Sequence, residues 1–174
     1  MSPGKRNAAG QAIVNSLFQT IDLSRVDVFH CFISIERFGE IDTGPIFERL
    51  WNEHPSVRTV VPRIDRATGE LESVRYGPDV ELRFDRWQIG EPTHDDTVAP
   101  EEVDIVIVPL LCFDVTGHRV GYGKGYYDRF LSRCRADCQK IGLSMFSPVE
   151  SITDAHEGDV KLDLCITPDE IYRF

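Results

Sequence analysis

The chain has 174 residues, which is enough for one domain with a substantial core, and its 41% hydrophobic and 28% charged residues are ordinary for a globular protein. Its formal net charge of -10 creates a surface field that repels nucleic acid and anionic membranes, so neither is expected as a partner. With no low-complexity linker to divide the chain, we expect a single domain that spans residues 1–174.

The N-terminal segment indicates a helix that begins at Pro3, because proline is favoured at the first helical position and Ser2 is a suitable N-cap. Apolar residues then recur on one face of this helix: Ala9, Ile13, Leu17 and Ile21. The run 26–35 has the composition of a strand.

A second helix is expected to be capped by Asp42 or Thr43, and its apolar side would consist of Ile46, Phe47, Leu50 and Trp51. Residues 57–62 follow as a short buried strand. A strand, a helix and a strand in succession predict that the two strands pair in parallel through a right-handed crossover.

The middle of the chain is more polar. Residues 64–76 predict a surface hairpin, because Ala67-Thr-Gly-Glu70 lies between two polar, alternating arms. Residues 82–88 are expected to be extended, and the stretch 89–100 to form a loop.

The apolar run 104–113 predicts the central strand of the sheet, and it ends at Asp114. A glycine-rich stretch from Gly117 follows. Its continuation after Gly125 predicts a helix whose buried face consists of Tyr127, Phe130 and Leu131.

Three further elements complete the order: a strand at 139–145, a loop or short helix at 147–159, and a last strand at 162–167. This order predicts one α/β domain in which helices flank a mostly parallel central sheet.

The five cysteines are odd in number and include no C-x-x-C pair, which suits reduced thiols in a cytoplasmic protein: Cys31, Cys112, Cys134, Cys138 and Cys165. Cys134 and Cys138 are four residues apart, but no second pair supports a zinc site. The sequence shows neither a signal peptide nor an apolar run of membrane-spanning length.

The glycine-rich stretch carries the clearest chemical signal. Gly121, Gly123 and Gly125 allow backbone amides to approach an anion closely, and Arg119 and Lys124 add positive charge. The carboxyl end of a strand that leads into a helix is also where α/β proteins bind phosphate. A structural turn with a solvated lysine is the alternative, but the combination favours an anion site.

Two common phosphate motifs do not fit this stretch. Walker A needs glycine where His118 stands and serine or threonine where Gly125 stands. The dinucleotide fingerprint needs a wider spacing than that of Gly121, Gly123 and Gly125. Asp128, in the predicted helix, is a candidate to hold a magnesium ion together with a phosphate.

Residues 119–131 resemble the signature of the 5-formyltetrahydrofolate cyclo-ligases, also called methenyltetrahydrofolate synthetases. Shorter stretches resemble other landmarks of that family in the same order along the chain: Gly39-Glu-Ile-Asp-Thr43, Val61-Pro-Arg63, Ile89-Gly-Glu-Pro92, Asp104 to Asp114, Ile141-Gly-Leu143 and Asp159-Val-Lys-Leu-Asp163. Each short match is weak alone, and their shared order makes them persuasive.

This resemblance implies a NagB/RpiA/CoA-transferase-like fold with a small antiparallel hairpin, and an ATP-dependent ligase of one-carbon metabolism. The family uses ATP with Mg2+ to convert 5-formyltetrahydrofolate into 5,10-methenyltetrahydrofolate, ADP and phosphate. The formyl oxygen attacks the γ-phosphate, N10 closes the ring, and phosphate leaves. The resemblance also implies a monomer or weak dimer.

The resemblance assigns roles to individual residues. The nucleotide would contact Arg119, Val120, Gly121, Tyr122, Gly123, Lys124, Gly125, Tyr126 and Tyr127, with Arg119, Lys124 and Tyr126 serving the catalytic step. The folate would contact Phe32, Ile33, Glu40, Trp87, Tyr122, Gly123, Lys124, Gly125 and Tyr126. Asp128 and Asp159 would hold the metal. Core packing is an equal alternative for Phe32, Ile33 and Trp87, and Glu40 alone would pass for a solvated turn residue.

The sequence departs from the family pattern at three places. It begins near the end of the basic helix that usually opens the family, and Lys5 and Arg6 match later positions. Residues 146–148 stand where a glutamine is common, and Gly158 replaces a histidine, although His156 is close by. The alternatives to an active ligase are therefore a folate- or nucleotide-binding relative without turnover and a different phosphate-using enzyme on the same scaffold.

Overall fold

The computed structural model describes residues 3–35, 39–84 and 89–174. In chain order, the elements are α1 (Pro3–Thr20), the 3-10 helix η1 (Leu23–Arg25), β1 (Val28–His30), α2 (Gly44–Glu53), β2 (Arg58–Ile64), β3 (Leu71–Arg75), β4 (Leu82–Phe84), β5 (Gly90–Pro92), β6 (Thr97–Val98), the 3-10 helix η3 (Pro100–Glu102), β7 (Ile105–Val108), β8 (Cys112–Phe113), β9 (Arg119–Val120), α3 (Tyr126–Leu131), β10 (Gln139–Leu143), β11 (Leu164–Ile166) and β12 (Ile171–Arg173).

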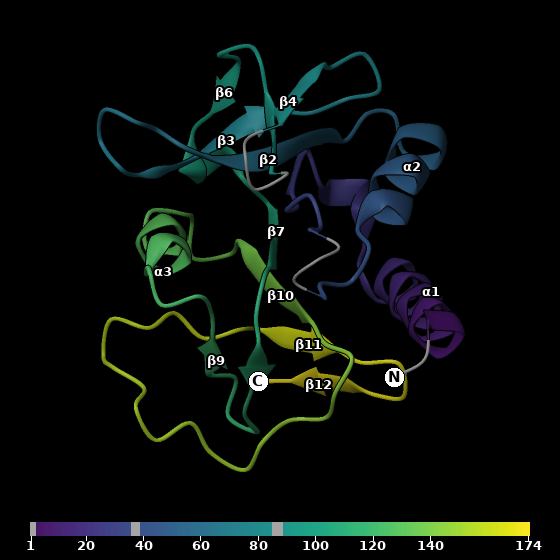
Figure 1. Ribbon diagram of the computed structural model, residues 1–174, viewed down its shortest axis with the longest axis vertical. Helices are drawn as coiled ribbons and strands as arrows, with labels where there is room; N and C mark the ends of the chain where they lie inside the picture. Colours follow the sequence, from purple (N-terminus) through teal and green to yellow (C-terminus); the bar gives the residue numbers. More distant parts are fainter. Residues whose placement is uncertain (1–2, 36–38, 85–88) are drawn as a thin grey trace.

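An eight-stranded sheet with the order β12-β11-β10-β7-β1-β2-β3-β6 forms the centre of the molecule (Figure 1). Its five central strands, β11 to β2 in that order, pair in parallel, and the remaining pairings are antiparallel. The α/β class, the mostly parallel sheet and the parallel pairing of the first two strands are confirmed.

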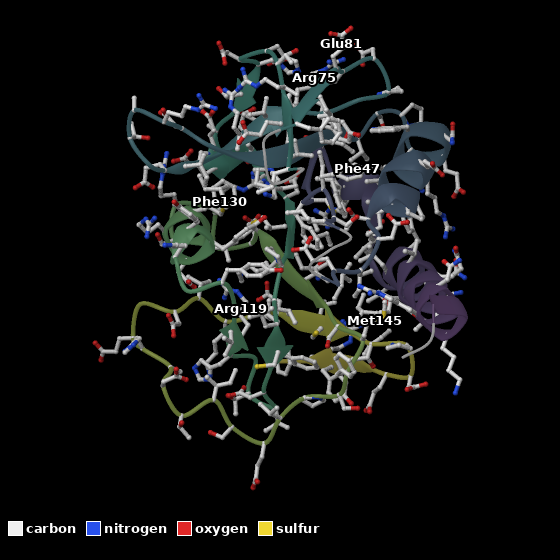
Figure 2. All side chains as sticks on the ribbon, viewed as in Figure 1. Phe47, Arg75, Glu81, Arg119, Phe130 and Met145 are labelled. Atoms are coloured by element: carbon white, nitrogen blue, oxygen red, sulfur yellow. The ribbon has the colours of Figure 1, made fainter. Side chains whose placement is uncertain are left out.

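Side chains of successive strand residues enter two separate cores, because neighbouring residues of a strand point to opposite faces. The core that includes α1 and α2 contains Leu17, Phe47, Val61, Ile107 and Ile141. The core that includes α3 contains Val28, Val60, Val106, Val108 and Phe130. Phe47 and Phe130 lie on opposite sides of the sheet in Figure 2. The sheet is therefore covered on both faces, as a parallel sheet requires.

The first strand is shorter than predicted. Residues 26–35 were expected to be extended throughout, but ladder pairing covers only β1, and the backbone N–H of Cys31 makes one further bond to Val60. Beyond that point, the Thr43 hydroxyl donates to the carbonyl of Phe32 at 2.8 Å and accepts the N–H of Ser34 at 3.1 Å. A side chain thus replaces the neighbouring strand as the partner of this backbone.

The side chain of Asp42, and not that of Thr43, caps the N-terminus of α2. Thr43 occupies the N-cap position without a side-chain cap bond, whereas Oδ1 of Asp42 accepts the N–H of Gly44 at 3.0 Å. Of the two predicted caps, the aspartate therefore makes the bond.

The predicted central strand 104–113 is divided into two strands. Strand β7 ends before Pro109, which has no N–H to continue the ladder. Strand β8 then leaves the main sheet and pairs with β9 as an antiparallel ribbon. This ribbon carries the chain from the centre of the sheet to the glycine-rich stretch.

The predicted hairpin at 64–76 exists, but its prediction as a surface feature was wrong. Strands β2 and β3 extend the main sheet, and Leu71 and Val74 are buried. The predicted loop at 89–100 contains β5, which pairs with β4, and β6, which pairs with β3. These strands have two or three residues, too few to show an alternating pattern in sequence.

The five cysteines are free thiols, in agreement with the prediction. None of the helices in the described parts of the chain has the length and apolar content that a membrane crossing needs.

Candidate functional site

A glycine loop, residues 121–125, joins β9 to α3. Gly123 and Gly125 have φ angles of 77° and 64°, in the left-handed region that favours glycine. A Cβ added at Gly121 or Gly123 would meet no heavy atom within 4 Å. The space beside the backbone at Gly121 and Gly123 is therefore open, so that a ligand can approach the loop there.

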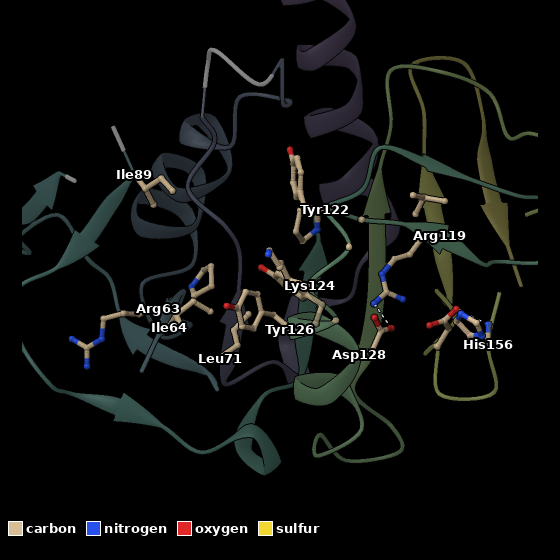
Figure 3. A pocket seen from close by; sticks show the side chains of 18 of the residues that line it. Arg63, Ile64, Leu71, Ile89, Arg119, Tyr122, Lys124, Tyr126, Asp128 and His156 are labelled. Carbon is tan, nitrogen blue, oxygen red and sulfur yellow. Dashed lines mark hydrogen bonds and ion pairs between the residues drawn. The ribbon is translucent and has the colours of Figure 1, made fainter. Parts of the chain in front are cut away.

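The larger of two cavities beside this loop has a volume of about 640 Å³ and is bordered by every residue from 119 to 128. Its apolar side includes Ile64 and Leu71, from the hairpin of β2 and β3. Asp154, His156 and Asp159 line the far side. Figure 3 shows Lys124 between these two sides, with Ile64 and Leu71 to its left and Asp128 to its right.

Lys124 supplies the accessible positive charge of this cavity. Its side chain is exposed, and its ammonium group has no hydrogen bond or ion pair with the described residues. Arg63 also borders the cavity, but its guanidinium points away and bonds Glu72 at 2.6 Å and Asp95 at 2.9 Å (Figure 3). An anion that enters the cavity would therefore meet the charge of Lys124.

Arg119 lies deeper in the same wall. Its side chain is 5% exposed, and its guanidinium donates to Oδ1 of Asp128 at 2.8 Å and to the carbonyl of Val160. Asp128 also accepts the N–H of Val160, at 3.1 Å. The positive charge of Arg119 is thus neutralised locally, and Asp128 is held in place.

Two carboxylates on this side can serve a metal ion. Oδ1 of Asp128 is engaged by Arg119 and Val160, and Oδ2 of Asp159 accepts the N–H of His156 at 2.8 Å. No cluster of three or more metal-ligating side chains occurs among residues 3–35, 39–84 and 89–174. The residues therefore fit a hard cation that brings phosphate and water ligands with it, as Mg2+ does, and they do not form a complete protein cage.

A smaller cavity of about 230 Å³ adjoins the first, and Phe32, Glu40 and Ile41 line it together with residues 143–146. Oε2 of Glu40 accepts the N–H of Ile35 at 2.7 Å. The carbonyl of Glu40 accepts Nη2 of Arg6 at 3.1 Å, so α1 also holds this segment.

Tyr122 and Pro109 border both cavities. The Tyr122 hydroxyl donates to Oε1 of Glu40 at 2.8 Å, which connects the glycine loop to a segment 82 residues earlier in the chain. Burial and this hydrogen bond raise the pKa of Tyr122 to about 12, so the phenol keeps its proton and acts as the donor.

The predicted site residues fall into groups. Arg119 to Asp128 and Asp159 line the larger cavity, while Phe32, Glu40 and Tyr122 line the smaller one. Ile33 lines neither cavity and packs against the core beside α1 and α2. Trp87 lies outside the described residues.

Several lining residues had no predicted role, including Pro109, Ser144, Phe146 and Asp154. Pro109 directly follows β7, and Ser144 directly follows β10. The signal that would have found them is their position, because ligands collect at the carboxyl ends of neighbouring parallel strands.

Asp114 fixes the base of the site. It is 2% exposed; its Oδ1 accepts the N–H groups of Thr116 and His118, and its Oδ2 accepts that of Ile152. Burial alone would raise the pKa of Asp114, but the hydrogen bonds from Ile152, Thr116 and His118 hold the pKa well below its usual range. One carboxylate thereby joins the ribbon of β8 and β9 to the loop that carries Ile152, a cavity residue.

His30, in β1, packs against the buried face of α3. It is completely buried, its ring lies 4.9 Å from that of Phe130 and 5.9 Å from that of Tyr127, and its Nδ1 bonds the Ser73 hydroxyl at 2.8 Å. Burial lowers the pKa of His30 to about 3, so the ring is neutral at physiological pH. The helix that follows the glycine loop therefore rests on an uncharged imidazole.

Comparison with known families gives a match over nearly the whole chain. The model of the 5-formyltetrahydrofolate cyclo-ligase family matches residues 1–168. A protein named 5-formyltetrahydrofolate cyclo-ligase from Escherichia coli (strain K12) is 28% identical, over the whole of this chain and 96% of its own length. Its namesake from Haemophilus influenzae is 30% identical over 73% of this chain and 67% of its own length.

The fold is also similar to solved structures. The NMR structure of 5,10-methenyltetrahydrofolate synthetase from Aquifex aeolicus aligns with a TM-score of 0.82 at 27% identity. That alignment covers 99% of this chain and 84% of the other.

Proposed function

The chain belongs to the 5-formyltetrahydrofolate cyclo-ligase family, and we propose that it converts 5-formyltetrahydrofolate into 5,10-methenyltetrahydrofolate at the expense of ATP, releasing ADP and phosphate. The observation that carries this proposal is that one glycine loop borders two adjoining cavities. A reaction between two ligands needs such a shared wall, because the reacting atoms must be held close together.

The ATP phosphates are assigned to the larger cavity. The glycine backbone, with open space beside Gly121 and Gly123, and the ammonium group of Lys124 suit a phosphate chain. Lys124 is the residue assigned to the γ-phosphate, because its charge has no partner among the described residues. Tyr126, at the start of α3, borders the same space. Arg119 would act indirectly, because its guanidinium holds the carboxylate of Asp128 in position.

A magnesium ion, which this family uses with ATP, fits Asp128 and Asp159. Both carboxylates line the larger cavity, and two carboxylates with phosphate oxygens and water are a typical ligand set for this ion. When bound, the ion would neutralise phosphate charge during transfer.

The pterin of the folate is assigned to the smaller cavity. Glu40 presents a carboxylate that can accept paired N–H donors, and Phe32 provides part of an apolar wall. The rest of the substrate would extend past Tyr122, so that its formyl group meets the γ-phosphate beside the glycine loop.

The chemistry proceeds in two steps. The formyl oxygen attacks the γ-phosphorus, and ADP leaves. N10 of the folate then adds to the activated formyl carbon and loses its proton to solvent, and the bond between that carbon and the former formyl oxygen breaks, so that phosphate departs as the five-membered ring closes. Lys124 stabilises the negative charge of the transferred group, and the loop amides hold it in position.

The test is an absorbance assay for methenyltetrahydrofolate with purified protein. Product is expected only when 5-formyltetrahydrofolate, ATP and Mg2+ are all present. Absence of product at high protein concentration, while calorimetry shows that the folate and the nucleotide both bind, would contradict the proposal and favour a binding protein without turnover.

A further inference from the structure

The bond between Tyr122 and Glu40 connects the two cavities through side chains. Tyr122 is part of the glycine loop assigned to ATP, and Glu40 is the carboxylate assigned to the pterin. Their hydroxyl and carboxylate are 2.8 Å apart, although 82 residues separate them in sequence. The two assigned sites are therefore in direct contact through these side chains.

Glu40 is fixed on the side away from the loop. Ile35 donates its N–H to one carboxylate oxygen, and Arg6 of α1 donates to the Glu40 carbonyl. The neighbouring Gly39 has a φ of 73°, and a Cβ there would lie 3.2 Å from the Arg6 guanidinium. Tyr122 consequently bonds to an acceptor whose position is set by α1 and by the segment after β1.

The carboxylate can bind Tyr122 and a substrate at the same time, because each of its oxygens offers two acceptor sites. Substrate N–H donors that orient Glu40 would also fix the oxygen that accepts the Tyr122 hydroxyl. Since the tyrosine remains protonated, the bond persists across the neutral pH range.

The glycine loop is the element that gains from this bond. Gly121 and Gly123 flank Tyr122, and a Cβ added at either position would meet no heavy atom within 4 Å. Because glycine has more backbone freedom to lose than other residues, ordering this loop costs conformational entropy. A ligand that has already fixed the loop reduces this cost for the second ligand, which produces positive coupling between their affinities.

Resting on the proposed function, we propose that Tyr122 is a positioning residue that couples the two substrates: a folate bound at Glu40 holds the glycine loop through the Tyr122 hydroxyl and thereby strengthens nucleotide binding. The coupling is reciprocal, so a bound nucleotide strengthens folate binding by the same factor.

The test is calorimetry of a non-hydrolysable ATP analogue with Mg2+, in the absence and presence of saturating 5-formyltetrahydrofolate. In the unaltered chain, the folate is expected to tighten analogue binding at least about fivefold. Tyr122→Phe removes the hydroxyl and keeps the ring, and it should reduce that factor below about twofold. Tyr76→Phe is the matched control, because Tyr76 packs on Phe47 and Trp51 and lines neither cavity.

Two outcomes would overturn the inference. In the first, the coupling factor remains unchanged in Tyr122→Phe; any loss of folate affinity is then equal with and without the nucleotide, which limits the tyrosine to orienting Glu40. In the second, both ligands bind to the unaltered chain but show no coupling. If the unaltered chain binds no 5-formyltetrahydrofolate, the proposed function itself fails, and this inference fails with it.

Discussion

The Arg119 guanidinium lies 2.8 Å from Oδ1 of Asp128, and the same oxygen accepts the N–H of Val160 at 3.1 Å. One carboxylate therefore joins β9, α3 and the segment before β11. Its second oxygen has no hydrogen bond to the described residues, and Asp128 lines the larger cavity. Asp128 thus combines a structural contact with an oxygen that is available to a ligand.

Asp128→Asn should lower kcat by at least about 100-fold and leave 5-formyltetrahydrofolate affinity within about threefold. The amide can still accept from Arg119 and Val160, so the folding free energy should fall by only about 1–2 kcal/mol. Steady-state kinetics, calorimetry and urea unfolding measure the three quantities. Asp169→Asn, at an exposed position outside both cavities, is the control. Full activity in Asp128→Asn would remove the residue from the metal site.

Lys124→Met should lower kcat by about 100- to 1000-fold, because the side chain that we assign to the transferred phosphate loses its charge. Folate binding measured by calorimetry should change little. Lys161→Met is a matched control, since Lys161 is exposed and borders neither cavity. An equal loss of activity in both variants would indicate that overall charge is responsible, and not the position of Lys124.

Glu40→Gln should weaken 5-formyltetrahydrofolate binding by about 10- to 100-fold, because a neutral amide offers weaker acceptors to paired N–H donors. Nucleotide binding in the absence of folate should change by less than about threefold. Calorimetry with each ligand separately measures both effects. Glu48→Gln on the exposed side of α2 is the control, and unchanged folate affinity in Glu40→Gln would exclude Glu40 from the pterin site.

The burial of His30 should make the folded protein less stable in mild acid. Burial lowers the pKa of His30 to about 3 from an ordinary value of 6.5, so the unfolded chain takes up a proton that the folded protein excludes. The stability that the buried, neutral imidazole contributes is fully present above pH 6.5, and it is lost as the pH falls from 6.5 towards 3. Between pH 7 and pH 4 this single group should cost about 3 kcal/mol of unfolding free energy.

Urea unfolding of His30→Gln over the same pH range tests this contribution. The variant should be less stable at pH 7, because it loses packing against Phe130, but its stability should fall less steeply towards pH 4. His54→Gln at the end of α2 should keep the original slope. If His30→Gln also keeps that slope, the imidazole does not control the acid response.

Local chemistry was sufficient to predict the main elements of the fold and the glycine loop. Apolar strand runs and helical spacing identify the parallel sheet and its helices. At Gly123 and Gly125 the left-handed φ angles explain why glycine is needed. Pro109 and Ser144 had no predicted role, although the rule that ligands collect at strand carboxyl ends would have pointed to them.

Contacts between distant segments could not be predicted from local patterns. Nothing near Tyr122 in sequence indicates that its hydroxyl reaches Glu40, or that Asp128 neutralises Arg119 in the cavity wall. The division of the 104–113 run also depends on where Pro109 meets the end of the sheet. Such features arise from tertiary packing, which composition and periodicity do not encode.

The two outermost strands of the sheet limit how this chain can join another one edge to edge. Strand β6 has two residues and β12 has three, and each runs antiparallel to its neighbour. An added strand at either edge would gain only a few backbone hydrogen bonds, which makes open-ended strand addition unfavourable. The short, antiparallel edges thus keep the five parallel strands between them from becoming a template for aggregation.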